Sequence, residues 1–336
     1  MLVFQALFIS CKSGQTPNAS SLSTVNVTFL HLNDVYEIAP LEGGKVGGMA
    51  RVATVRKELL AQNPNTITLL AGDFLNPSLI ATFKHEGKSI KGKQMVEVMD
   101  AIGMDWVGLG NHEFDVDEAE LVERINLSKF NWLASNAFHN TPNGVEPFTK
   151  NGVFFPKTTV LTFKNALGAS VKVGMFSVVL PANKKNFVVY DDFFESAKKA
   201  YQELKPQCDF VVAITHLNKV DDAKLAEILP EVKLLMGGHD HDNMIQKVGD
   251  VVIAKADANA KTVYVHNFSF DTKTKKVNLT SELRKIDDTI AEDASVATIV
   301  QKWEQILDAA IKKMGLDKND VVTTLDTPLD GRESSI

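Results

Sequence analysis

Short apolar segments alternate along this chain with amphipathic segments, and this alternation limits the fold more than any other feature. Five apolar segments have the length and composition of strands, and they begin at Val25, Thr66, Asp105, Cys208 and Val232. The segments between them show helical periodicity, as in residues 47–62, where Val52, Val55 and Leu59 recur on one side. Strands that alternate with helices form sheets covered by helices, so the sequence predicts an α/β fold.

The rest of the chain adds antiparallel strands and one long helix. A hairpin is expected from TTVLTFK and SVKVGMFSVV around NALGA, and three further strand-like segments follow Met244. An amphipathic helix is expected from Ile290 to Leu316, before the strand-like ending VVTTLDTPLDGRESSI. We therefore expect a folded unit at 24–288, a linker helix at 289–318 and, at 319–336, the truncated start of a second domain.

The composition excludes several classes of function. The net charge is −6, with acidic and basic residues interspersed, which argues against nucleic-acid binding. No apolar run approaches the roughly 18 residues of a membrane span. Residues 1–23 open apolar, reach Cys11 and then turn small and polar, which resembles an export signal or a lipoprotein signal that would place a lipid anchor on Cys11. An exported protein is expected; a disordered tail or a wrongly chosen start codon are the alternatives.

Metal-binding residue types follow each of the five apolar segments. The residues are Asp34, Asp73, Asn111 with His112, His216, and His239 with His241. Ligands of open α/β sheets bind at the carboxyl ends of the strands, so these side chains are expected to converge. A single histidine at a strand end is ordinarily a structural residue. Their joint occurrence in this order predicts one site.

The chemistry of these residues favours metal ions. Carboxylates, an amide oxygen and imidazoles suit a first-row divalent or trivalent metal. Residues two apart in an extended segment face the same way, so His239 and His241 can serve adjacent ions, and Asp73 is the natural carboxylate to bridge them. Two metals at one site activate water and bind a phosphoryl group.

Five motifs in this order resemble those of a known family. The motifs ND, GDFLNPS, GNHEFD, THL and GGHDH resemble the calcineurin-like metallophosphoesterases, and specifically their 5'-nucleotidase branch. The ending LDGRESSI resembles the start of that branch's C-terminal domain, and the resemblance covers 26–336. It implies a four-layer α/β/β/α metallophosphoesterase sandwich, with 24–288 as the catalytic domain.

The resemblance also implies the role of each site residue. One ion would be bound by Asp34, Asp73 and His241, and the other by Asp73, Asn111, His216 and His239. His112 would be the catalytic imidazole and Asp115 its partner, while Asn111 and His112 would contact substrate. The cofactors would be two divalent or mixed-valence ions, such as Mn, Zn, Fe, Co or Mg.

One position departs from the family pattern. Members of the family show D-x-H at the first strand, whereas this chain has NDVYEI and so places Tyr36 where the imidazole is expected. Tyr36 could bind as phenolate, water or Glu37 could fill the position, or the first site could be weak and turnover low.

The implied function is hydrolysis of nucleoside monophosphates to nucleoside and phosphate. A phosphodiesterase acting on substrates such as 2',3'-cyclic nucleotides is the alternative on the same site. A non-catalytic metal-binding or nucleotide-binding protein is the alternative of another class. In each case the expected partner is a small phosphate ester or nucleotide rather than a nucleic acid.

Overall fold

Two six-stranded sheets form the centre of the protein. The computed structural model describes residues 23–317, 321, 323 and 324. The first sheet has the order β19 (Val277–Lys285), β18 (Thr262–Asp271), β1 (Thr24–Leu32), β2 (Thr66–Ala71), β5 (Trp106–Gly108) and β6 (Asn131–Leu133). The second has the order β11 (Thr158–Lys164), β12 (Ser170–Val179), β14 (Phe210–His216), β15 (Leu234–Gly237), β17 (Val251–Lys255) and β16 (Met244–Val248).

Parallel strands occupy the part of each sheet that carries the predicted ligands. Strands β1, β2, β5 and β6 run parallel, as do β12, β14, β15 and β17. The antiparallel strands β18 and β19 extend the first sheet, and β11 and β16 form the edges of the second. The predicted hairpin of 158–164 and 170–179 is confirmed as β11 and β12.

An apolar core lies between the two sheets, which pack face to face. Phe29 and Phe268 of the first sheet and Ile214 of the second are fully or almost fully buried there, and the rings of Phe210 and Phe268 stack 4.8 Å apart. Strands buried on both faces need near-continuous apolar sequence, which explains why β14, buried at every position, reads FVVAITH without a polar alternation.

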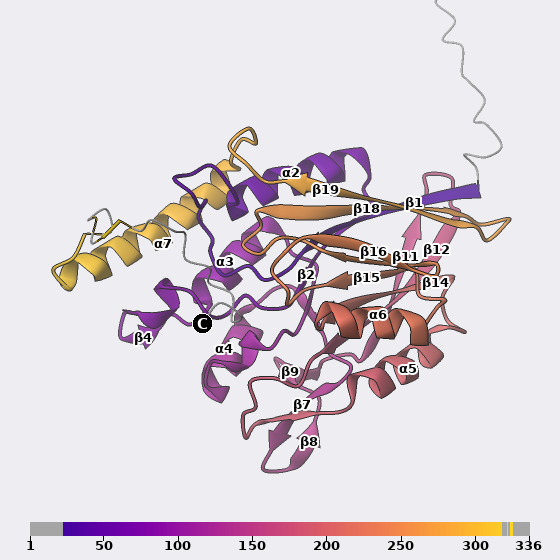
Figure 1. The fold of residues 1–336 in the computed structure, drawn as a ribbon, viewed down its shortest axis with the longest axis horizontal. Coiled ribbons are helices and arrows are strands. Elements are labelled where there is room, and N and C mark those ends of the chain that lie inside the picture. Colours follow the sequence, from indigo (N-terminus) through magenta and orange to yellow (C-terminus); the bar gives the residue numbers. More distant parts are fainter. Residues whose placement is uncertain (1–22, 318–320, 322, 325–336) are drawn as a thin grey trace, which may run out of the picture.

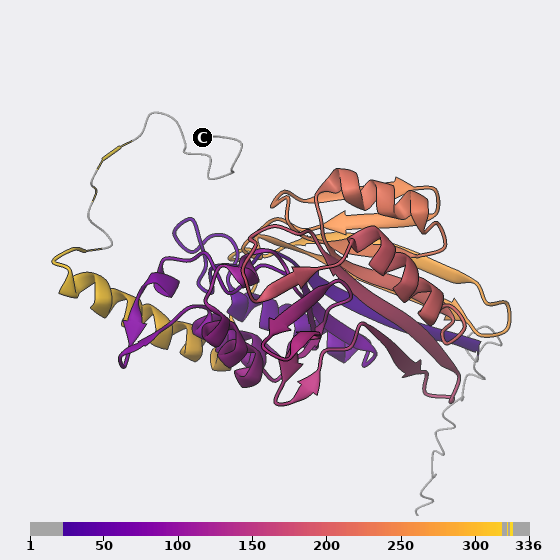
Figure 2. The same cartoon turned by 90° about the horizontal axis from the view of Figure 1, so that it is seen from below.

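Helices cover the two outer faces of the sandwich. The first sheet packs against α2 (Met49–Gln62), α3 (Lys93–Ile102), α4 (Glu118–Leu127) and α7 (Ala294–Lys313). The second packs against α5 (Phe193–Leu204) and α6 (Lys219–Ile228). Figures 1 and 2 show α5 and α6 on the opposite side of the sheets from α2 and α7. The expected four-layer α/β/β/α architecture is confirmed.

Local sequence explains where helices begin and end. The helix α3 ends at Gly103, whose φ of 84° suits glycine, and α4 begins with a capping box of Asp117 and Glu120. The smaller elements include two 3-10 turns, η1 (Ile80–Thr82) and η2 (His112–Phe114). Two short strand pairs are β3 (Lys84–His85) with β4 (Lys88–Ser89) and β9 (Thr149–Lys150) with β10 (Val153–Phe154). A three-stranded sheet has the order β13 (Val188–Tyr190), β7 (Ala137–Thr141) and β8 (Gly144–Glu146).

The long helix near the C-terminus packs on the sandwich. It spans Ala294–Lys313. The helix begins four residues after the expected start, because Asp293 caps its first turn, and it ends three residues before the expected end. Trp303 is 2% exposed and donates its indole N–H to Glu97 of α3 at 2.8 Å. The helix is thus part of the core around α2 and α3; its role as a linker over 289–318 stays a prediction.

Two predicted features lie outside the described residues. These are the leader up to residue 22, including Cys11, and most of 319–336. Within the described part of the chain, no helix combines the length and the apolar character needed to cross a bilayer.

Candidate metal centre

The predicted ligands all follow the carboxyl ends of parallel strands. Asp34 and Asp73 each lie two residues beyond a strand of the first sheet, β1 and β2, and Asn111 lies three beyond β5. His216 ends β14, and His239 follows β15 in the second sheet. Because the two sheets pack face to face, these ends from both sheets meet at one rim of the sandwich.

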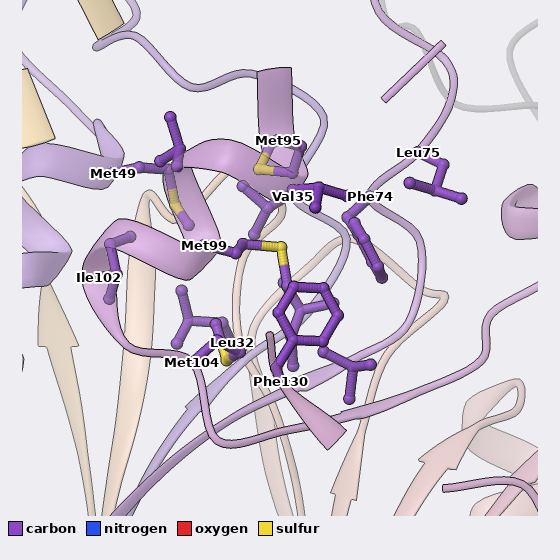
Figure 3. Close-up of a cluster of buried hydrophobic side chains, with 14 of the residues drawn as sticks. Leu32, Val35, Met49, Phe74, Leu75, Met95, Met99, Ile102, Met104 and Phe130 are labelled. Carbon is purple, nitrogen blue, oxygen red and sulfur yellow. The ribbon is translucent and has the colours of Figure 1, made fainter. Parts of the chain in front are cut away.

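Apolar neighbours hold the acidic loops in place. Val35 and Phe74, each directly after a ligand aspartate, point into a methionine-rich core with Met95 and Met99 (Figure 3). Asp34 has a φ of 52° and Asp73 a φ of 61°, a conformation that L-residues adopt only when the surroundings require it. The buried neighbours therefore turn the two carboxylates away from the core and toward the rim.

Two glycines allow the loops to approach each other. A Cβ on Gly110 would lie 2.2 Å from Oδ1 of Asp73, and a Cβ on Gly238 would lie 2.5 Å from the carbonyl oxygen of Ala71. Both distances are shorter than any real contact, so only glycine fits at these positions. The two glycines therefore let the GNHEFD and GGHDH loops pack directly against the end of β2 and the Asp73 loop.

Two buried carboxylates and an imidazole form the centre of the cluster. One ligand atom each of Asp34, Asp73 and His241 lie within 4.8 Å of one another, and both carboxylates are inaccessible to solvent. His241 Nε2 lies 3.4 Å from Asp34 Oδ1. Burial opposes ionisation of Asp34, but the charges of His216 and His241 outweigh it and lower its pKa to about 2.

The tautomer of His216 leaves the other ring nitrogen available as a ligand. Nδ1 lies 2.7 Å from the carbonyl oxygen of Ala71, which can only accept, so Nδ1 carries the proton. Nε2 then faces Asp73 Oδ2 at 3.1 Å and Asp34 Oδ1 at 3.9 Å. A ring nitrogen without a proton and a carboxylate oxygen are both acceptors, so the contact between His216 Nε2 and Asp73 Oδ2 requires a cation, either a proton or a metal ion.

Asn111 and His239 complete the rim. The buried Oδ1 of Asn111 has no hydrogen-bond partner among the described residues, which is unusual for a buried polar atom and fits a metal ligand. The ring of His239 lies 5.4 Å from that of His216, and its backbone N–H donates to Asp34 at 2.9 Å. The residues present therefore fit a metal centre.

Tyr36 lies inside the cluster. Its hydroxyl is 3.1 Å from Asp73 Oδ2, 3.1 Å from His241 Nε2 and 3.5 Å from Asp34 Oδ1. Burial and the charges of the two aspartates raise the pKa of this phenol above its ordinary value. Burial raises the pKa of Glu37, and the expectation that Glu37 or water fills the position of the usual imidazole stays a prediction.

His112 and Asp115 form a pair beside the cluster. Their Nδ1 and Oδ2 atoms are 2.5 Å apart, and His112 Nε2 lies 4.0 Å from Asp73. Burial disfavours the imidazolium, but the hydrogen bond to Asp115 and the charge of Asp73 outweigh it and raise the pKa of His112 to about 9. The imidazole thus presents Nε2 toward the carboxylates.

Sequence reasoning missed the residues that hold this pair and its loops. Asn183 donates to Asp115 Oδ1 at 2.7 Å and to the carbonyl oxygen of Asn111 at 3.1 Å, and Asn76 donates to Asp115 Oδ2 at 3.0 Å. Buried Glu113 accepts backbone N–H groups from Gly110, Asp73 and Phe74 at 2.6 to 2.9 Å, joining two ligand loops. Glu113 lies within the motif GNHEFD, which could have indicated its importance, whereas no sequence motif indicated Asn183.

The fold and this cluster together define the class of the protein. A four-layer sandwich with carboxylates and imidazoles at its strand ends is the architecture of the metallophosphoesterases. The family model described as calcineurin-like phosphoesterase matches residues 27–243. The chain belongs to the calcineurin-like phosphoesterase family, whose members use a dinuclear metal site.

Several characterised proteins are similar over most of the chain. The 5'-nucleotidase of Mus musculus is 24% identical over 330 residues, covering 88% of this chain and 55% of that protein. The snake venom 5'-nucleotidase of Gloydius brevicauda is 25% identical, covering 83% and 51%. The crystal structure of a 5'-nucleotidase precursor from Thermus thermophilus superposes with a TM-score of 0.73 at 23% identity, covering 86% and 60%. The chain spans about half the length of the curated relatives it matches.

Proposed function

We propose that this chain is the catalytic part of a two-metal phosphoester hydrolase that acts on nucleotides, in the manner of a 5'-nucleotidase. The observation that carries this proposal is the buried pair Asp34 and Asp73, which faces imidazoles from the other sheet and lies beside the His112–Asp115 pair. Buried acids that face imidazole nitrogens at one rim suit metal ions far better than they suit a structural core.

The proposed ligand sets follow the geometry of the rim. One ion takes Asp34, Asp73 and His241, and the second takes Asp73, Asn111, His216 and His239. The contacts of Asp73 Oδ2 with both His216 and Tyr36 support Asp73 as the shared ligand. Bound divalent or mixed-valence ions such as Mn, Zn, Fe, Co or Mg neutralise a phosphoryl group and make a water molecule more acidic.

His112 is proposed to act directly on the substrate. Its side chain is a quarter exposed, whereas the Asp73 carboxylate is closed to solvent, so His112 faces the space that a phosphate ester would enter. With Asp115 accepting from Nδ1, Nε2 can donate to a phosphoryl oxygen or to the leaving oxygen, a contribution of ~10²–10⁴ in rate. Asn111 is proposed to contact the substrate from the same turn.

The substrate class rests on the similar proteins. Several of them are named 5'-nucleotidases, which supports nucleoside monophosphates as substrates. Another, from Bacillus subtilis, is named a trifunctional nucleotide phosphoesterase, so other nucleotide phosphoesters belong in the same assay.

The test is a panel of substrates with the metal-loaded chain. Phosphate release is measured from 5'-monophosphates, 2',3'-cyclic nucleotides and an aryl phosphate, with added Mn²⁺ or Co²⁺. We expect hydrolysis of 5'-monophosphates that His112→Ala reduces by ~10²–10⁴, while His85→Ala, a histidine outside the site, retains wild-type rates. A faster reaction with cyclic nucleotides would reassign the chain as a phosphodiesterase.

One observation favours a non-catalytic metal-binding protein as the second candidate. The Tyr36 hydroxyl occupies the centre of the first ligand set, where it competes with an ion for Asp73 and His241. Turnover of any panel substrate that is lost in His112→Ala would rule out this candidate.

A further inference from the structure

A lysine is completely buried next to the candidate metal centre. Lys255 ends strand β17 and its side chain is inaccessible to solvent. Its Nζ lies 2.6 Å from the carbonyl oxygen of Leu217, 2.5 Å from Asp240 Oδ2 and 2.7 Å from Asp222 Oδ2. The ammonium donates hydrogen bonds to the Leu217 carbonyl oxygen and to Asp240, and the Asp222 carboxylate adds a buried ion pair.

The partners of Lys255 belong to the segments that carry histidine ligands. Leu217 directly follows His216, and Asp240 stands between His239 and His241. Asp222 lies on α6 and is fully buried, so it anchors the ammonium to the helix layer. One buried cation therefore connects all three imidazoles of the second sheet to a rigid helix.

The surroundings are shaped for this side chain. Gly237 is the register partner of Lys255 in the parallel pair β15 and β17. A Cβ on Gly237 would lie 2.9 Å from Cε and 3.1 Å from Cγ of Lys255. The first glycine of GGHDH thus leaves room for the lysine stem, a constraint separate from the close approach at Gly238.

We propose that Lys255 is a positioning residue for the metal centre, acting through Asp240. By holding the Asp240 carboxylate and the Leu217 carbonyl, it fixes the backbone on both sides of His239 and next to His216, so that the imidazoles face Asp34 and Asp73. Asp240 is only about a quarter exposed, and the ammonium keeps this third carboxylate from turning toward the ions. The role in metal binding rests on the proposed function.

The experiment measures metal binding rather than turnover. Metal-free wild-type protein, Asp240→Asn and Lys255→Met are titrated with Co²⁺, by calorimetry and by the visible spectrum of bound cobalt. We expect both variants to bind Co²⁺ roughly 10- to 100-fold more weakly, the range found when groups that orient metal ligands are removed. A changed cobalt spectrum is also expected, because the imidazole positions change. The matched control is Lys247→Met, an exposed lysine of the adjacent strand β16 that pairs with Asp250.

Asp240→Asn keeps the inference testable if Lys255→Met does not fold, since it leaves the contacts of Lys255 with Leu217 and Asp222. A folded Asp240→Asn protein with wild-type Co²⁺ affinity and spectrum would overturn the inference, even with a lower melting temperature, because that pattern describes a purely structural contact. The double variant should bind Co²⁺ no more weakly than Lys255→Met alone. Wild-type protein that binds Co²⁺ but cleaves no phosphate ester would refute the proposed function and leave this inference intact.

Discussion

The phenol oxygen of Tyr36 lies 3.1 Å from Oδ2 of Asp73, within the group of buried acids and imidazoles rather than beside it. The same oxygen is 3.1 Å from His241 Nε2. A phenol donates one proton and accepts through its oxygen, so Tyr36 can donate to Asp73 while it accepts from a protonated His241 Nε2. Tyr36 therefore lies directly among the atoms proposed to bind the first ion.

Replacing Tyr36 by histidine should strengthen binding of the first ion. A neutral imidazole nitrogen is a better ligand for a first-row divalent metal than a protonated phenol. We expect Tyr36→His to bind Mn²⁺ or Zn²⁺ at least about tenfold more tightly at one site, measured by calorimetric titration of metal-free protein. Tyr36→Phe, which keeps the ring and removes the oxygen, is the control and should not gain affinity. Identical metal content and turnover in all three proteins would remove Tyr36 from the site.

Replacing Asp115 by asparagine should affect the reaction and not metal binding. Asp115 holds Nδ1 of His112 at 2.5 Å, and the other side chains that its carboxylate contacts, Asn76 and Asn183, are not proposed metal ligands. We expect kcat to fall by ~10², with the alkaline limb of the pH profile shifted to lower pH because the imidazolium loses its acceptor. Asp117→Asn, an exposed acid two residues away, is the control. Loss of bound metal in Asp115→Asn would contradict this assignment.

A buried pair of histidines should make the fold sensitive to acid. His31 Nε2 donates to the carbonyl oxygen of Gly237 at 3.0 Å, so Nδ1 is the acceptor that faces His266 Nε2 at 3.4 Å. His266 Nδ1 in turn lies 2.7 Å from the Ser281 hydroxyl. Both rings are fully buried, and burial lowers the pKa of His31 to about 4 and that of His266 well below its ordinary value.

The sign of this effect follows from proton uptake. Below pH 6.5 the unfolded chain protonates these rings, whereas the folded chain does not until about pH 4. Stability is therefore complete above pH 6.5 and falls between pH 6.5 and 4, by on the order of 3 kcal/mol for His31. In metal-free protein, His31→Phe should reduce the slope of unfolding free energy against pH by about 1.4 kcal/mol per pH unit in this window. His85→Phe is the control, and an equal slope in wild type and His31→Phe would disprove the idea.

Truncating Trp303 should destabilise the whole sandwich. Trp303 fixes α7 on α3 through its buried ring and its bond to Glu97. Trp303→Ala should cost about 3–5 kcal/mol in urea unfolding, whereas Trp303→Phe should cost much less because it keeps most of the apolar contact. A loss below about 1 kcal/mol for the alanine variant would show that α7 is a loosely attached linker.

The positions of the proposed ligands could be predicted because each follows an apolar strand directly. Asp34, Asp73 and His216 depend only on where β1, β2 and β14 end, and hydrophobic patterning locates those ends. The His112–Asp115 pair and the four-layer order were predicted from the resemblance of GNHEFD and GGHDH to known motifs. Nothing in the local sequence indicated Asn183, which reaches Asp115 from the loop after β12, 68 residues further along the chain.

Lys255 is a second residue whose surroundings could not be predicted from the sequence. A lysine at the end of the apolar strand VVIAK has the sequence appearance of an exposed end of a strand. Only the packing of α6 and the GGHDH turn around β17 brings Asp222, Asp240 and the Leu217 carbonyl to its ammonium group. The choice between an exposed and a buried lysine depends on partners that lie 15 to 38 residues away in sequence.

The main strands, the main helices and the residue types at each strand end follow from the amino-acid sequence alone, because backbone periodicity and apolar burial are local properties. The tertiary structure decided which atoms face one another: the Nδ1–H of His216 on Ala71, the Tyr36 hydroxyl on Asp73 and the Lys255 ammonium on Asp240. These contacts join segments from different strands and, at His216 and Ala71, from different sheets. Hydrogen bonds and charge interactions act over a few ångströms in space, so their partners exist only once the two sheets have packed together.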